Sequence, residues 1–245
     1  MNSEQRGISG LHFTLFGIPV IIQHFSWLVL GILGLLFFDH MANPLPAILI
    51  FIVVGMLSLL AHEMGHALVG RLFTRTTPLV IIGNLGGTTY HPRPARTRAQ
   101  HFLMVLAGPL AGYILGIISA LLCGIQLGEP IILIEAYILH PLVAPEIPHT
   151  AAVLGLMHPV TALMYSIFFM ITFWWTVFNL LPILPMDGGQ LLLTATNRPK
   201  IAAGIGLALS TLLAVWFLTG GSIFMAMMLG YFAWINWQIF NYKNN

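Results

Sequence analysis

The stretch LLAHEMGHALVG, residues 59–70, decides how this chain folds. It belongs to a segment from Ala47 to Leu72 that is otherwise almost entirely apolar and long enough to cross a bilayer. Yet three ionisable residues, His62, Glu63 and His66, lie in its interior. An ionisable side chain at the centre of a membrane helix costs roughly 2.5–3.5 kcal/mol on insertion scales. A partner must offset this cost, and a divalent metal ion is a partner of the required strength.

The spacing of these three residues indicates the role of each. Residues four apart on a helix differ by about 40° around the axis and by about 6 Å along it, so the imidazoles of His62 and His66 can bind one ion. Glu63 is rotated by about 100° from His62, beside the metal, where it can take a proton from a water molecule. This is the H-E-x-x-H arrangement of zinc metalloproteases, with glutamate as general base. The alternative is a set of buried polar side chains that bond to neighbouring helices.

The composition predicts an all-α polytopic membrane protein. Of the 245 residues, 58% are hydrophobic and only 7% are charged, whereas a soluble domain carries roughly 25% charged residues. The net charge of +2 comes with no basic tract outside one loop, so nucleic acid is not an expected partner. The single cysteine, Cys123, excludes a disulfide framework and a cysteine-based metal site.

Six transmembrane helices are expected, because segments that span a membrane must satisfy their own backbone hydrogen bonds. The first is short unless it extends back through IPVIIQHF, residues 18–25, which otherwise lies in the membrane interface. We interpret residues 128–158 as a cap on the outer side. The chain is expected to form one domain over residues 1–245, with a catalytic core at about 47–195 and extra helices at about 20–40 and 201–240. The expected spans are Phe25–Phe38, Ala47–Phe73, His101–Leu127, a fourth from about Val160, Ile201–Leu218 and Ile223–Phe240.

The distribution of basic residues predicts the orientation. With six spans and a cytoplasmic N-terminus, all nine Lys and Arg residues fall on the cytoplasmic side, as the positive-inside rule requires. The charged residues of the loops on the opposite side are all acidic. We therefore expect both termini in the cytoplasm. The outer acidic residues are Asp39, Glu129, Glu135 and Glu146.

A third zinc ligand is expected from another helix, because catalytic zinc usually has three protein ligands and a water. Asp187, in NLLPILPMDGGQ (residues 179–190), follows the return of the fourth span to the cytoplasmic half, the depth expected for His66. The prolines and glycines around it interrupt the helix, and broken backbone at this depth is tolerated where it lines a cavity. An N-cap role for Asp187 is an alternative that can coexist with ligation.

Four motifs together resemble the site-2 protease family of intramembrane zinc metalloproteases. They are HEMGH (62–66), GNLGGTT (83–89), LAGPLAG (106–112) and NLLPILPMDGG (179–189). The resemblance covers residues from about 50 to 195. It implies zinc ligation by His62, His66 and Asp187, one ion per chain, with Glu63 as base. It also implies that Asn179 positions the substrate or polarises the scissile carbonyl.

Residues 80–90, VIIGNLGGTTY, are rich in glycine and β-branched residues. The resemblance implies a small re-entrant β-hairpin or loop here that pairs with an unwound substrate strand. Asn84, Gly86 and Gly87 are then the substrate-binding residues. An ordinary cytoplasmic turn is the alternative. Gly108, Gly112 and Gly116, spaced four apart, predict a face for close helix packing.

The expected function is zinc-dependent cleavage of transmembrane segments of membrane-anchored proteins near the cytoplasmic face. We expect a multi-pass protein of a prokaryotic inner membrane, in contact with lipid, with any regulatory protein supplied in trans. A membrane metal transporter or channel that uses the same His and Asp residues is one rival. A catalytically silent member of the family is another, although it would usually lack the base or a ligand.

Overall fold

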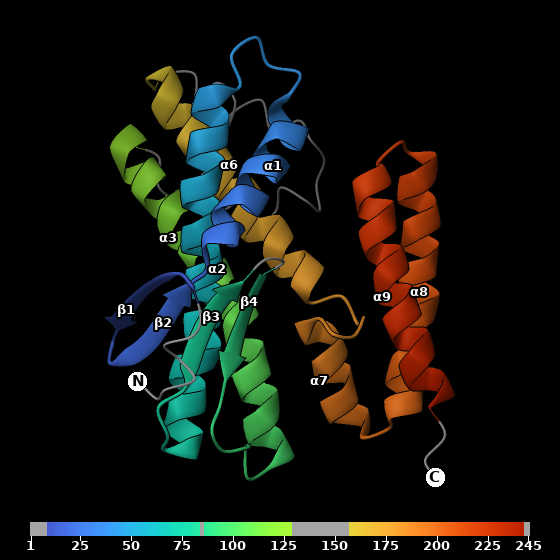
Figure 1. Cartoon of the computed structure of the whole chain (residues 1–245). Helices are drawn as coiled ribbons and strands as arrows, with labels where there is room; N and C mark the ends of the chain where they lie inside the picture. Colours follow the sequence, from blue (N-terminus) through green and yellow to red (C-terminus); the bar gives the residue numbers. More distant parts are fainter. Residues whose placement is uncertain (1–8, 84–85, 129–156, 243–245) are drawn as a thin grey trace.

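The computed structural model describes residues 9–83, 86–128 and 157–242. Within them the chain is mostly helical, with one small sheet (Figure 1). Five helices are long and apolar enough to cross a membrane, namely α2, α3, α6, α8 and α9. The first expected span is α1, whose 15 residues make it shorter than these five. The helices are α1 His24–Phe38, α2 Leu45–Thr74, α3 Arg98–Leu127, α6 Pro159–Asn179, α7 Asp187–Thr196, α8 Pro199–Thr219 and α9 Ile223–Asn241.

Helices α2, α3 and α6 pack against one another (Figure 1). Small residues allow this close approach, as the sequence predicted for the glycine face of α3. A Cβ on Gly65 of α2 would overlap the backbone carbonyl of Ala107 in α3. Gly112 of α3 faces Thr176 of α6, whose Oγ1 would lie 3.4 Å from an added Cβ. The close-packed faces therefore bring the middle of α2 against α3, and α3 against α6.

A four-stranded sheet, in the order β1-β2-β3-β4, lies beside α2. Its strands are β1 Leu11–Leu15, β2 Ile18–Ile22, β3 Leu79–Gly83 and β4 Gly86–Tyr90. Strands β3 and β4 form the expected antiparallel hairpin, with Gly83 opposite Gly86. Asn84 lies outside the described residues. Because β4 is the last strand of the sheet, one of its edges is not paired within the sheet.

The interpretation of residues 18–22 as an extension of the first helix was wrong. These residues form β2, which pairs antiparallel with β1 and parallel with β3. Phe16 and Gly17 both have positive φ, at 50° and 75°, as a tight hairpin turn of type I′ requires. Pro19 precedes the parallel pairing, which begins at Val20, so its missing N–H costs no β3 hydrogen bond.

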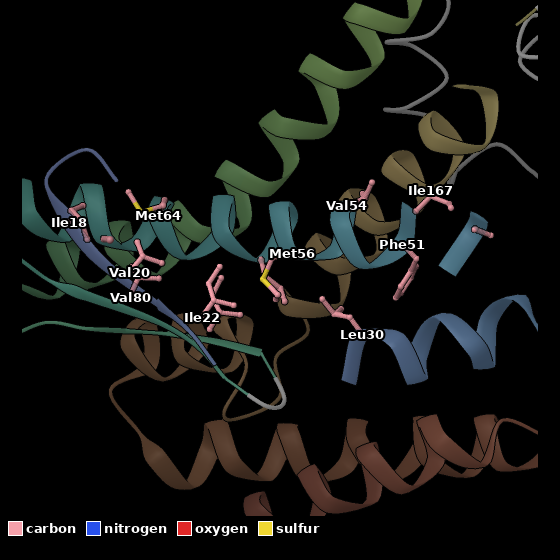
Figure 2. Packing of buried hydrophobic residues seen from close by; sticks show 14 residues of the cluster. Ile18, Val20, Ile22, Leu30, Phe51, Val54, Met56, Met64, Val80 and Ile167 are labelled. Atoms are coloured by element: carbon pink, nitrogen blue, oxygen red, sulfur yellow. The ribbon is translucent and has the colours of Figure 1, made fainter. Parts of the chain in front are cut away.

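The main hydrophobic core lies between the sheet and α2. Val20 and Ile22 of β2 and Val80 of β3 point toward α2, where Met56 and Met64 face them (Figure 2). Val20, Val80 and Ile82 are at most 1% exposed, so the sheet has one fully covered face. This packing fixes the sheet against the segment of α2 that contains His62, Glu63 and His66.

Helices α8 and α9 form a pair beside the other helices and are joined to them through α7 (Figure 1). Asn236 of α9 is fully buried, and its Nδ2 donates hydrogen bonds to the carbonyl oxygens of Leu184, at 2.7 Å, and Phe232, at 2.8 Å. The first bond ties α9 to the loop that precedes α7. The expected outer cap at residues 128–158 lies almost entirely outside the described residues.

Candidate metal centre

Three side chains from two distant parts of the chain converge in the interior. His62 and His66 come from α2, and Asp187 is the first residue of α7. Nε2 of His62 lies 3.0 Å from Oδ2 of Asp187, and Nε2 of His66 lies 3.4 Å from the same oxygen. The two Nε2 atoms are 3.2 Å apart. All three residues are at most 9% exposed.

This triangle of atoms fits zinc. Tetrahedral ligands at 2.0–2.2 Å from an ion lie about 3.3–3.5 Å from one another, close to the three observed separations. Asp187 Oδ2 is buried without a hydrogen-bond partner among the described residues, although both imidazoles lie near it. A buried carboxylate oxygen without a hydrogen bond is costly. A shared cation at the centre of the triangle would remove that cost.

The tautomer of His66 also favours metal binding. Its Nδ1 lies 2.8 Å from the carbonyl oxygen of Met104, which can only accept a hydrogen bond, so Nδ1 carries the proton. In the neutral ring Nε2 then presents its lone pair toward His62 and Asp187. Donation of the second ring N–H to a backbone carbonyl is the usual way in which a metal-binding histidine is held.

Gly108 of α3 lies directly against the His66 ring, because a Cβ at this position would overlap the imidazole. The sequence predicted Gly108 as a packing residue, and the structure shows that the group it accommodates is His66. The same helix therefore provides both the space for the ring and, through Met104, the acceptor that orients it.

Asp187 is held by a compact turn. The carbonyl of Ile183 accepts a hydrogen bond from the N–H of Met186 at 2.9 Å. A Cβ on Gly188 would overlap the Leu180 carbonyl, and one on Gly189 would overlap the backbone at Ile183. The MDGG sequence is therefore required for the chain to turn back upon itself. The N-cap alternative for Asp187 was wrong, because the cap position is Met186 and Asp187 begins the helix.

Glu63 lies next to the two histidines, as the sequence predicted. A carboxylate oxygen of Glu63 and ring nitrogens of His62 and His66 all lie within 4.8 Å of one another. The carboxylate also receives a hydrogen bond from strand β4, where Oγ1 of Thr89 donates to Oε2 at 2.7 Å. No role could be assigned to Thr89 from the sequence. Its one signal is its position two residues after Gly87, on the same face of a strand.

Asn179 does not join this group. It ends α6, and its Nδ2 donates to the Trp175 carbonyl at 2.9 Å. His91 lies against Gly70 of α2, where a Cβ would overlap the ring. Burial lowers the pKa of His91, and the positive charges of His66 and His101 lower it further.

The chain is similar to known proteins in sequence and in fold. The model of peptidase family M50 matches residues 50–213, more than half of the chain. A Synechocystis protein with the curated name "Putative zinc metalloprotease sll0528" is 28% identical over 187 residues. This alignment covers 73% of the chain but only 42% of that protein, so the chain spans less than half of its length. The solved site-2 protease of Methanocaldococcus jannaschii has the same fold, with a TM-score of 0.59, 18% identity and coverage of 96% and 97% of the two chains.

Proposed function

Because this chain belongs to peptidase family M50, the site-2 type of zinc metalloprotease, we propose that it is an active intramembrane endopeptidase. Its substrates are membrane-anchored proteins, cut within a transmembrane segment near the cytoplasmic face. The chain is an integral membrane protein with five apolar helices of spanning length in the part that the structure describes. The proposal places the reaction at His62, Glu63, His66 and Asp187.

The observation that carries the proposal is the triangle of His62, His66 and Asp187 with Glu63 beside it. Three ligand atoms within 3.4 Å of one another leave a fourth tetrahedral position for water or substrate, as in catalytic zinc sites. A transporter would use similar ligands but would not need a carboxylate held beside them without ligating. Here Glu63 is held by Thr89 of β4.

The chain's own residues then divide the chemistry. Zinc held by the three ligands would lower the pKa of a water molecule and polarise the peptide carbonyl. Glu63 accepts the proton of the attacking water as a new C–O bond forms. It then delivers this proton to the amide nitrogen as the C–N bond breaks, which leaves a carboxylic acid and an amine. Asn179 donates one amide N–H to Trp175, and we propose that its second N–H contacts the carbonyl.

The substrate must be extended at the site, because a helix hides its peptide bonds. Strand β4 is the edge strand of the sheet and packs on α2, so one row of its backbone N–H and C=O groups is not paired within the sheet. Addition of a substrate strand to an exposed sheet edge is a common mode of peptide recognition. We propose that the substrate pairs along β4, whose first residues are Gly86 and Gly87. Asn84, two residues before Gly86 in the sequence, remains a proposed substrate-binding residue. Any regulator acts in trans.

A comparison of membrane proteomes tests this function. Cells that express the intact protein should contain shortened forms of one or more membrane proteins, and cells that express Glu63→Gln should accumulate the full-length forms. The control is Gln100→Glu, in the first turn of α3, where Glu keeps the side-chain oxygen that accepts a hydrogen bond from the Arg96 N–H. If no membrane protein differs in length between intact protein and Glu63→Gln, the proposed function is wrong.

A further inference from the structure

Strand β4 makes a specific contact with the side chain of Glu63 that neither the fold nor metal binding requires. Oγ1 of Thr89 lies 2.7 Å from Oε2 of Glu63 and 3.0 Å from the backbone carbonyl oxygen of the same residue. Both are acceptors, so the Thr89 hydroxyl is the donor. A hydrogen bond to an ionised acceptor is roughly twice as strong as one between neutral groups.

The same strand limits the Glu63 side chain at a second point. A Cβ on Gly87 would overlap Cγ, Cδ and Oε1 of Glu63. Gly87 and Thr89 are two residues apart and so lie on the same face of β4. The carboxylate therefore rests against the Gly87 backbone while the Thr89 hydroxyl holds one of its two oxygens.

Resting on the proposed function, we propose that Thr89 is a positioning residue for the catalytic base. Its hydroxyl occupies Oε2, which leaves Oε1 as the oxygen that accepts the proton from water. Gly87 provides the space in which this orientation is possible. The strand that is proposed to bind the extended substrate thus also orients the base.

The physical need for such a residue follows from the glutamate side chain, which has three rotatable bonds. A general base must lie within about 2.6–3.2 Å of the proton it takes, or reach it through one water. The helix fixes only the Cα of Glu63. In a buried site with two imidazoles nearby, the carboxylate could instead turn onto the metal and lose its function as a base. The hydrogen bond from Thr89 opposes that rotation.

The chain offers a matched control in the next residue. Thr88 precedes Thr89 on β4 and points to the opposite face, where its side chain is exposed. Thr88→Val and Thr89→Val make the same chemical change at adjacent positions of one strand. Only the second removes the hydrogen bond to Glu63.

The test measures kcat, KM and zinc content in purified protein reconstituted in phosphatidylcholine vesicles. The probe is a membrane protein that intact cells shorten and Glu63→Gln cells do not. Thr89→Val should lower kcat by about 10- to 100-fold, the effect of losing one hydrogen bond to a charged group. KM and zinc content should stay within about twofold of wild type. Thr89→Ser, which keeps the hydroxyl, should recover most of kcat, and Thr88→Val should match wild type.

Three results would overturn the inference: kcat of Thr89→Val equal to that of Thr88→Val, a change confined to KM, or no recovery in Thr89→Ser. The first would leave Thr89 without a role in the reaction, and the second would make it a substrate contact. Failure of the proposed function gives a different result, since wild type and Glu63→Gln would then be equally inactive on every membrane protein.

Discussion

At the residue scale, Asp187 completes the set of three candidate zinc ligands. Its carboxylate closes the triangle with the two imidazoles across two elements that are more than 100 residues apart in the chain. We predict that Asp187→Ala loses zinc and activity together, while Glu63→Gln keeps zinc and loses activity. Metal analysis of the two purified variants checks this. Full zinc occupancy in Asp187→Ala would remove Asp187 from the ligand set.

Gly108 gives a second prediction at this scale, because its missing side chain makes room for His66. Gly108→Ala should force the imidazole away from the triangle and reduce zinc affinity by about 10- to 100-fold, the usual cost of disturbing the surroundings of a metal ligand. Gly112→Ala is the control, since its added methyl would meet Thr176 Oγ1 at 3.4 Å. Competition with a zinc chelator measures the zinc affinity of the two variants. Equal affinities in the two variants would contradict the packing argument.

The sequence predicted the identities of these residues but not all of their contacts. The relative positions of His62, Glu63 and His66 could be predicted from HEMGH, because the helical repeat fixes them. Asp187 could be found because few polar residues are available in a chain with 7% charge. The hydrogen bonds from His66 to Met104 and from Thr89 to Glu63 could not, because they depend on how α3 and the sheet dock on α2.

At the scale of elements, the loop before α7 depends on α9. The Asn236 amide donates to the Leu184 carbonyl, three residues before Asp187, and is packed against Gly206 of α8. Asn236→Leu should lower zinc affinity by about three- to tenfold, the free-energy equivalent of one hydrogen bond of roughly 0.6–1.5 kcal/mol. Asn241→Leu is the control, because among the described residues Asn241 donates its side-chain hydrogen bond to Trp237 of its own helix. Equal zinc affinity in the two variants would show that the Asn236 hydrogen bond does not support the metal centre.

The elements that the sequence missed are β1 and β2. Residues 18–22 form a short apolar run beside a helix, and such a run has no periodicity that separates a buried strand from a helix extension. The turn at Phe16 and Gly17 has a glycine at only one of its two positive-φ positions, so the usual hairpin signal was weak. Helices α2, α3 and α8, by contrast, begin and end beside Pro, Gly or Arg residues that are visible in the sequence.

At the scale of the whole molecule, the positive-inside pattern predicts a defined orientation. Cysteines introduced at Arg96 and Lys243 should react in intact cells only with a membrane-permeant reagent, because this pattern predicts that both lie on the cytoplasmic side. A cysteine at Thr219, the exposed last residue of α8, should react with an impermeant reagent. Labelling of position 96 by the impermeant reagent would show that the predicted orientation is wrong and that the metal centre lies near the outer face.

The central claim is that zinc at His62, His66 and Asp187 and the base Glu63 together cut a membrane-embedded peptide bond. The most direct measurement follows cleavage of one substrate in vesicles as zinc is removed by a chelator and then restored, in wild type and in Glu63→Gln. Wild-type cleavage should fall to background with zinc removal and return in proportion to bound zinc. Glu63→Gln should bind the same zinc and remain at least about 100-fold slower. Cleavage by zinc-free protein, or equal rates in the two zinc-loaded proteins, would contradict the account.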